Sequence, residues 1–184
     1  MLKEDYQKKV IPEMKKEFGY KNDLAVPRIE KVVINTGIGR ILLNTDPSQR
    51  EKTIEEISSD LALITGQKPL VTKSKKSISA FKLRKGMPVG LKVTLRRSRM
   101  FDFLDRLINI VIPRMRDFQG ISRKSIDKNG NLTLGIKEHI IFPEIQPEKS
   151  KRIFGLEITI VTSAKTKEEA IRLFELIGFP LAKE

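Results

Sequence analysis

Residues 89–97 alternate apolar with polar side chains. The apolar positions are Leu91, Val93 and Leu95, and the polar positions between them are Lys92, Thr94 and Arg96. Because successive side chains of a β-strand point to opposite faces, this pattern predicts a strand with one buried face and one solvent face. Such a strand needs an apolar cover on one side only, which amphipathic helices can supply.

Several other segments have the apolar spacing of such helices. From Leu2 to Phe18 apolar residues recur every four positions, with Pro12 expected to bend or divide the helix and Gly19 to end it. A second predicted helix starts at Asp46-Pro47, a cap candidate followed by a first-turn proline. Its apolar stripe, which ends at Gly66, consists of Ile54, Ile57, Leu61 and Ile64.

Two further helices are predicted in the second half of the chain. The first starts at a possible cap, Ser98, and should end at Pro113. The second covers Thr166–Ile177, where Thr166 and Glu169 have the spacing of a capping box and Gly178 is the expected stop.

The remaining apolar segments predict strands. They are Ile29–Thr36, a short extended piece at Pro69–Lys73, a hairpin with Arg123–Ile126 and Leu132–Ile136 around Asn129-Gly130, and Gly155–Ser163. The sequence therefore predicts an α+β fold in which helices pack on one face of a mostly antiparallel sheet. We expect one domain over residues 1–184, with helix 1–20 as an appendage and a long basic loop, residues 73–86, protruding from it.

Positive charge is concentrated in one interval. The 184 residues carry 36 Lys and Arg against 23 Asp and Glu, a formal charge of +13, yet no acid occurs between Asp60 and Asp102. The cations of this interval are Lys68, Lys73, Lys75, Lys76, Lys82, Arg84, Lys85, Lys92, Arg96, Arg97 and Arg99. An ordinary solvated surface intersperses the two signs, so this interval predicts a surface that binds polyanions, of which nucleic acid is the commonest.

The arrangement of these cations favours folded RNA. Lys92, Thr94 and Arg96 should share the open face of the sheet with Lys31 and Asn35, and the loop adds Lys and Ser side chains. Aromatic residues make up only 6% of the chain, so a platform for stacking single-stranded bases is not evident. No zinc-finger spacing or pair of recognition helices indicates DNA.

The composition argues against catalysis and against a membrane partner. The chain has no cysteine and one histidine, His139, expected to be a surface or packing residue. Gly37 and Gly39 lack the third glycine of a dinucleotide site, and Asp102 and Asp105 lie among arginines. No apolar run is long enough to span a bilayer. We expect no metal or cofactor. The two alternatives to a protein that binds folded RNA are an RNA-processing enzyme and a DNA-compacting protein.

Several ordered strings carry a family resemblance. They are VPRIEKVVINTGIG at residues 26–39, LITGQKP at 63–69, KKSI at 75–78, FKLRKGMPVGLKVTL at 81–95, RMRDFQG at 114–120 and FPEI at 142–145. Together they resemble the family of bacterial large-subunit ribosomal protein five, whose members bind 5S rRNA in the central protuberance. The resemblance spans essentially the whole chain.

The resemblance implies a cytoplasmic, non-enzymatic ribosomal protein. Its expected partners are 5S rRNA, large-subunit rRNA, peptidyl-site transfer RNA, small-subunit protein thirteen across an intersubunit bridge, and other proteins of the central protuberance. The residues implied for rRNA contact are Lys31, Asn35, Thr36, Gln67, Lys68, Lys92, Thr94 and Arg96. Those implied for transfer-RNA contact are Lys73, Lys75, Lys76, Ser77, Ser79, Lys82 and Arg84. Strict alternation places Thr36 opposite to Asn35, so its contact requires a bulge or the strand end.

Overall fold

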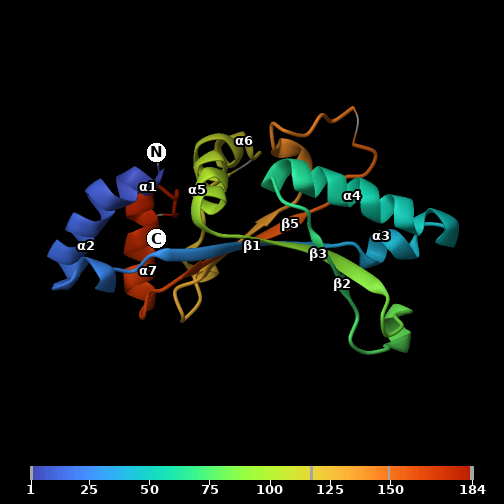
Figure 1. Cartoon of the computed structure of the whole chain (residues 1–184), viewed down its shortest axis with the longest axis horizontal. Coiled ribbons are helices and arrows are strands. Elements are labelled where there is room, and N and C mark those ends of the chain that lie inside the picture. The colour runs from blue at the N-terminus through green and yellow to red at the C-terminus, as the bar shows by residue number, and fades with distance from the viewer. Residues whose placement is uncertain (1, 117, 149, 183–184) are drawn as a thin grey trace. The chain divides into compact units, whose positions relative to one another are not determined.

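A computed structural model describes residues 2–116, 118–148 and 150–182 of the chain. Its strands are β1 (Ile29–Gly37), β2 (Leu70–Lys73), β3 (Pro88–Leu95), β4 (Leu132–Ile136) and β5 (Leu156–Thr162). They form one antiparallel sheet in the order β2-β3-β1-β5-β4 (Figure 1). The predicted α+β class is confirmed.

The longer helices occupy the expected parts of the sequence, whereas α3 (Gly39–Leu43) lies in a segment for which a loop was expected. The α-helices are α1 (Leu2–Asp5), α2 (Ile11–Phe18), α3 (Gly39–Leu43), α4 (Arg50–Thr65), α5 (Arg97–Arg106), α6 (Ile112–Arg114) and α7 (Lys167–Ile177). Two π-helical segments cover Tyr6–Val10 and Leu107–Val111, and short 3₁₀ turns cover Asp23–Ala25, Pro47–Gln49, Ser79–Phe81, Arg123–Ser125 and His139–Ile141.

The chain divides into two compact units. Unit 1 consists of Met1–Val33, Leu95–Leu134 and Ile158–Glu184, and unit 2 of Ile34–Thr94 and Gly135–Glu157. The strands β1, β3, β4 and β5 contribute residues to both units. The single domain over residues 1–184 stays a prediction.

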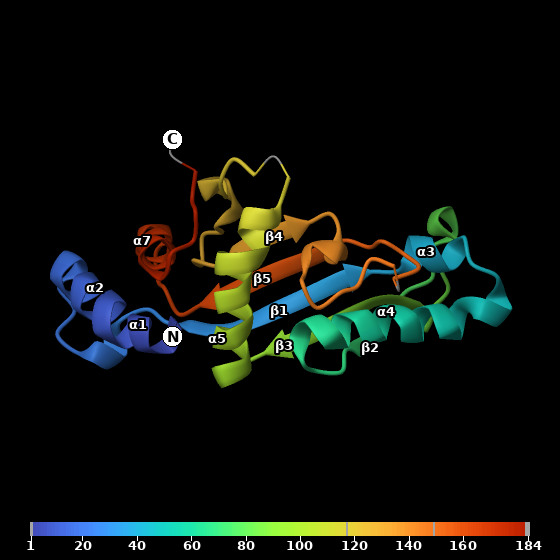
Figure 2. The same ribbon diagram turned by 90° about the horizontal axis from the view of Figure 1, so that it is seen from above.

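Unit 1 has a core that joins the two ends of the chain. Val10 and Met14 are buried with Val26 and with Leu173 of α7. Figure 2 shows α2 beside α7, and the Tyr6 hydroxyl donates a hydrogen bond to the Pro27 carbonyl at 2.9 Å. The N-terminal helical segment that we expect as an appendage therefore shares a core with the C-terminal helix.

Both prolines that should disturb helices follow a π-helical segment. Tyr6–Val10 precedes Pro12, and Leu107–Val111 precedes Pro113. Proline lacks the N–H of a regular helical bond and its ring crowds the preceding turn, so a wider turn accommodates it. Pro12 thus lies where the first helix changes from a π-helical to an α-helical segment, which agrees with the predicted division of this helix. The prediction that Pro113 ends its helix is wrong. That helix continues as α6 to Arg114.

Helix ends follow the local sequence in most cases. Gly19, Gly66 and Gly178 end their helices in the left-handed conformation, and the Thr166–Glu169 capping box of α7 is present. Two predicted caps are wrong. Asp46 precedes a 3₁₀ turn and its side chain makes no capping hydrogen bond. The helix α5 begins at Arg97, so Arg96 and not Ser98 is its N-cap residue.

The turn at Asn129-Gly130 does not join two strands. Residues before it form the 3₁₀ turn Arg123–Ser125, and only an isolated bridge links Ile126 to Leu132. The Asp127 carboxylate accepts hydrogen bonds from the backbone N–H groups of Asn129 and Asn131 at 2.9 and 2.8 Å. Partial burial acts to raise the pKa of Asp127, but these hydrogen bonds bring it below its ordinary value. The predicted hairpin is therefore wrong, because side-chain bonds replace the strand ladder.

In unit 2 the alternating strand has the predicted orientation. Leu91 and Val93 of β3 are buried, while Lys92 between them is exposed. On α4, Ile57, Leu61 and Ile64 are buried, and Figure 1 shows this helix beside the strands of the same unit. Gly90 lets the strands approach closely, since a Cβ there would lie 2.9 Å from the Thr36 carbonyl oxygen.

Candidate nucleic-acid interface

The open face of β3 in unit 2 carries Lys92 and Thr94. Lys92 is exposed, Thr94 is half-buried, and both alternate with buried apolar residues. The edge strand β2 pairs antiparallel with β3, and Leu70 stands directly opposite Lys92. Cross-strand partners project to the same face, so the exposed Leu70 side chain lies beside the aliphatic part of the Lys92 side chain. This face offers one cation, one hydroxyl and one apolar side chain.

Asn35 and Thr36 of β1 have different surroundings. Asn35 is half-buried, and its amide Nδ2 lies 3.5 Å from the Glu157 carboxylate, an acid on the same face. Thr36 is buried, and its hydroxyl donates to the Gly155 carbonyl at 2.8 Å. The Thr36 hydroxyl is therefore used within the protein. We therefore leave Thr36 out of the surface proposed below.

Gln67 and Lys68 connect α4 to β2. The helix ends at Gly66, and the Thr65 hydroxyl donates to the Gln67 carbonyl at 3.0 Å, which fixes the backbone of this turn. Lys68 is exposed and Gln67 is half-buried, two residues before the strand that faces Lys92. The structure thus brings Gln67 and Lys68 near the Lys92 face within unit 2.

Lys31 and Arg96 belong to unit 1. Lys31 is half-buried on β1, and its position differs from that of Asn35 by an even number of residues, so the two alternate in the same phase. Arg96 is exposed directly after β3. Lys31 is therefore partly accessible on a strand, and Arg96 is accessible just beyond the end of one.

The basic loop is an ordered extension of the β2–β3 hairpin. Backbone hydrogen bonds join Ser74 N to Met87 O at 2.8 Å and Gly86 N to Ser74 O at 2.9 Å. Farther out, Ile78 and Leu83 form an antiparallel bridge with N···O distances of 2.9 and 3.0 Å. The Ser77 hydroxyl also accepts from Lys85 N at 2.9 Å. This segment therefore has a defined backbone, although most of its side chains are exposed.

The predicted transfer-RNA contacts gather on this extension. Lys73, Lys75, Lys76, Ser77, Ser79, Lys82 and Arg84 are all exposed. Over the residues that the structure describes, none of these cations forms an ion pair, whereas Lys151 and Arg172 elsewhere do. Cations without carboxylate partners keep their full attraction for an external anion.

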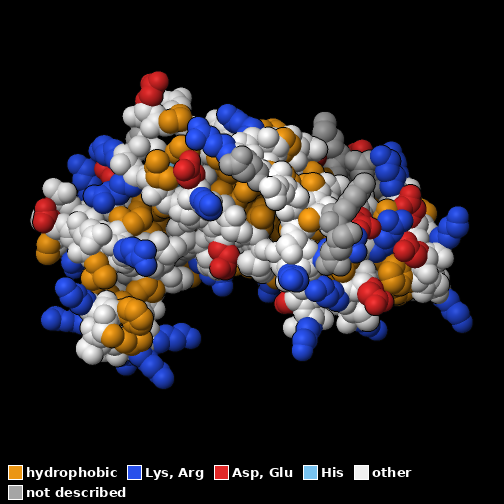
Figure 3. Space-filling model, turned by 180° about the vertical axis from the view of Figure 1, so that it is seen from behind, with side chains coloured by type: hydrophobic (Ala, Val, Ile, Leu, Met, Phe, Trp, Pro, Cys, Tyr) orange, Lys and Arg blue, Asp and Glu red, His pale blue; other side chains and the backbone are white. Residues whose placement is uncertain are grey.

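The structure adds three apolar residues that the sequence analysis did not assign to the interface. Leu70 on the open face, and Ile78 and Phe81 on the hairpin extension, are all exposed. Their position in an acid-free interval was visible in the sequence, but their exposure depends on the lack of a packing partner in the fold. Figure 3 shows apolar side chains on the projecting hairpin with Lys and Arg around them.

The surroundings of His139 do not form a catalytic site. Its ring is fully buried and stacks on Phe154 with centroids 3.8 Å apart. Nδ1 accepts the Phe154 backbone N–H at 3.4 Å, Nε2 lies 2.9 Å from the Ser150 hydroxyl, and that hydroxyl donates to Asp60 at 3.2 Å. In a nucleophilic triad the serine donates to the histidine, but here the Ser150 hydroxyl donates to Asp60, whose carboxylate also lies 3.5 Å from His139 Nε2. His139 is therefore a packing histidine.

Among the described residues no group of three or more His, Cys, Asp or Glu could hold a metal ion. Likewise, none of the helices in the described ranges is both long and apolar enough to cross a bilayer.

Two family models match the chain. One, described as Ribosomal protein L5, covers residues 22–84, and the other, the C-terminus of the ribosomal L5 family, covers residues 88–181. The chain belongs to the ribosomal protein L5 family. It is 56% identical over 182 residues to "Large ribosomal subunit protein uL5" of Kosmotoga olearia, covering 99% of this chain and 96% of that protein.

Two further relatives with the name uL5 are covered over nearly their whole length. A uL5 protein of Dictyoglomus turgidum is 54% identical over 183 residues, with 100% of this chain and 99% of that protein covered. One of Caldanaerobacter subterraneus is 53% identical over 182 residues, with 99% and 98% covered. This uL5-family chain is accordingly a structural, non-enzymatic constituent of the large ribosomal subunit and a ribosome-associated protein of the cytoplasm.

Proposed function

We propose that this uL5-family protein binds 5S rRNA in the central protuberance and contacts peptidyl-site transfer RNA through its basic hairpin. The open face of β3 in unit 2, with Lys92 and Thr94, and the turn at Gln67-Lys68 would meet rRNA. Lys31 and Arg96 of unit 1 would contact rRNA as well. The extension from Lys73 to Arg84 would meet transfer RNA. Small-subunit protein thirteen and other proteins of the central protuberance complete the proposed set of partners, on the basis of the family resemblance.

One observation carries the proposal: the acid-free hairpin places exposed cations on an ordered backbone. Hydrogen bonds at both ends of the extension hold its shape, and none of the proposed contact cations is paired to a carboxylate in the described part of the chain. Lys and Arg side chains displayed in this way neutralise phosphates and release counterions. Ser and Thr hydroxyls beside them can bond to phosphate and ribose oxygens.

A competition experiment tests the RNA preference. The purified full chain is bound to labelled 5S rRNA, with duplex DNA and transfer RNA as competitors at about 50 mM and about 200 mM salt. We expect 5S rRNA to be displaced only weakly by duplex DNA at both salt concentrations. Equal affinity for 5S rRNA, duplex DNA and transfer RNA in this competition would contradict the proposal and favour the DNA-compacting or generic polyanion-binding alternative.

A hairpin deletion tests the division of labour. Ser74 and Gly86 already share a backbone hydrogen bond, so residues 75–85 can be replaced by an Asn-Gly turn that keeps this bond. We expect the affinity for 5S rRNA to change by less than about threefold and binding to transfer RNA to be lost, because phosphate contacts are local. A comparable loss of both affinities would show that strand face and hairpin bind the same RNA.

A further inference from the structure

The end of the hairpin is fixed by its own backbone. The Ile78–Leu83 bridge encloses the 3₁₀ turn Ser79–Phe81, and Lys82 N donates to Ser79 O at 2.9 Å. Lys82 itself has φ of +49°, a left-handed conformation that reverses the chain. Side chains on this turn therefore leave the hairpin in defined directions.

Two apolar side chains on this turn have no cover. Phe81 is 68% exposed and Ile78 is 42% exposed. Single exposed apolar residues are common on proteins, but this pair lies on a turn held by hydrogen bonds and surrounded by cations. In Figure 3 the hairpin shows an apolar centre with Lys and Arg side chains around it.

The chemistry of this turn fits an exposed nucleobase. An aromatic ring stacks on the face of any base, and neighbouring cations bind the phosphates on either side of it. An apolar protein segment would match Phe81 and Ile78 but would gain nothing from the acid-free surroundings. A regular duplex matches the cations but hides the faces of its bases, whereas folded RNA displays unstacked bases at its loops and corners.

We propose that Phe81, flanked by Ile78, stacks on an unstacked base of a folded RNA while the cations of the hairpin hold the adjoining phosphates. This inference rests on the proposed contact between hairpin and transfer RNA. The sequence shows no evident platform for stacking single-stranded bases, and Phe81 would add one stacking position on the hairpin. Recognition by this hairpin then has one salt-sensitive component, from the cations, and one that salt barely changes, from Phe81.

The chain has no tryptophan, which makes a direct test possible. Phe81→Trp in the full chain introduces a single indole at the turn, and we expect transfer RNA to quench its fluorescence because a stacked base does so. An RNA duplex at equal phosphate concentration should bind with little quenching. The matched control is Leu24→Trp, which places an indole at a side chain that is 85% exposed in unit 1. Equal quenching of both indoles by transfer RNA would overturn the proposal.

Affinity measurements separate stacking from general apolar contact. We expect Phe81→Ala and Phe81→Leu each to weaken transfer-RNA binding by about tenfold with the salt slope unchanged, and Phe81→Tyr to bind like the parent. Lys82→Ala should instead lower the slope of log K against log salt by about 0.7–0.9. Full affinity of Phe81→Leu would overturn stacking while leaving the proposed function intact. Transfer-RNA binding unchanged by the hairpin deletion would contradict the proposed function itself.

Discussion

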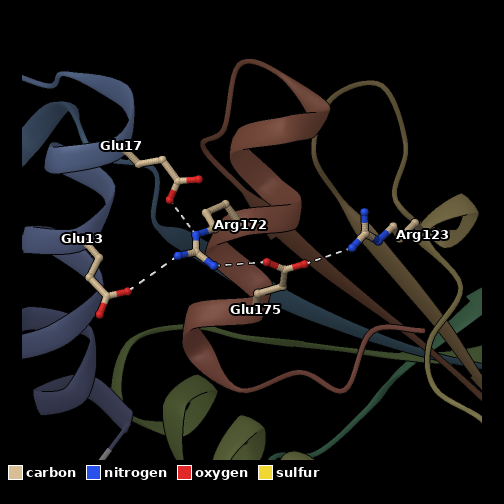
Figure 4. A network of polar contacts seen from close by, with 5 residues as sticks. All are labelled: Glu13, Glu17, Arg123, Arg172 and Glu175. Atoms are coloured by element: carbon tan, nitrogen blue, oxygen red, sulfur yellow. Dashed lines mark hydrogen bonds and ion pairs between the residues drawn. The ribbon is translucent and has the colours of Figure 1, made fainter. Parts of the chain in front are cut away.

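The contact between α2 and α7 in unit 1 and the basic hairpin in unit 2 use charge in opposite ways. Figure 4 shows Arg172 of α7 between three carboxylates, with Nε 2.6 Å from Glu17 and the two Nη atoms 3.9 and 3.3 Å from Glu13 and Glu175. Glu175 is also 3.3 Å from Arg123. The hairpin cations have no such carboxylates within the described chain.

This difference separates charges that hold the fold together from charges available to a partner. Removing a cation from the α2–α7 network should lower stability and leave RNA binding unchanged. Removing one from the hairpin or the open strand face should do the reverse, because an exposed unpaired cation contributes little to folding. Each prediction below tests one side of this contrast.

The largest effect is expected on the open strand face. The double change Lys92→Glu and Arg96→Glu should weaken binding to 5S rRNA by on the order of 100-fold, or about 3 kcal/mol, because each reversal removes a phosphate partner and adds repulsion. Filter binding measures the affinity, and thermal melting should give a midpoint close to that of the parent. The matched control is Lys151→Glu, since Lys151 pairs with Glu56 at 3.0 Å. Unchanged binding by the double variant would refute the strand-face assignment.

A substitution of His139 tests a polar side chain whose hydrogen-bond partners, Ser150 and Phe154, lie inside unit 2. His139→Gln should lower the free energy of unfolding by about 2 kcal/mol, because the ring stacked on Phe154 is lost from a buried site. Urea unfolding at neutral pH measures this loss. RNA binding should stay unchanged. A large loss of binding without loss of stability would contradict the distinction between groups that stabilise the fold and groups that bind RNA.

The same residue predicts a pH dependence. Burial lowers the pKa of His139, although the Asp60 carboxylate acts to raise it. The unfolded chain therefore binds more protons below the ordinary pKa of about 6.5, so stability should fall as the pH drops from there toward the folded pKa. Since the chain has one histidine, His139→Gln should flatten this slope between about pH 7 and the folded pKa. An equal slope in both proteins would contradict the assignment.

A smaller effect is expected at Arg172. Arg172→Ala should lower the free energy of unfolding by about 1 kcal/mol, because its contacts are partly exposed and the carboxylates around it then repel one another. A thermal melt at low and high salt measures this, and the difference between the proteins should shrink at high salt. Arg99→Ala, which removes an exposed arginine outside this network, provides the control and should melt like the parent. Weakened binding of 5S rRNA by Arg172→Ala would erase the distinction between the two regions.

The smallest effect concerns the turn of the hairpin. Lys82→Gly should raise the free energy of unfolding by a few tenths of a kcal/mol, because glycine adopts the left-handed conformation without strain but also loses more entropy on folding. The same change should lower the salt slope for transfer RNA by about 0.7–0.9. A large loss of stability would indicate that the Lys82 side chain is part of the fold rather than of the binding surface.

Local sequence determined much of this protein. The two-residue period of β3, the glycines that end α2, α4 and α7, and the capping box at Thr166 follow from neighbours a few residues apart. The acid-free interval likewise predicted a protruding basic loop, and the structure shows this loop as an extension of the β2–β3 hairpin. Such features can be predicted because the groups that interact are close in the chain.

The tertiary structure decided which side chains are buried. Thr36 faces inward because the Gly155 carbonyl lies beside it, and His139 is enclosed by Ser150, Phe154 and Asp60. Phe81 is exposed because no distant segment of its own unit covers the turn, although its apolar character suggests a core residue. Burial depends on contacts between segments far apart in sequence, so periodicity predicts the face of a strand but not what covers it.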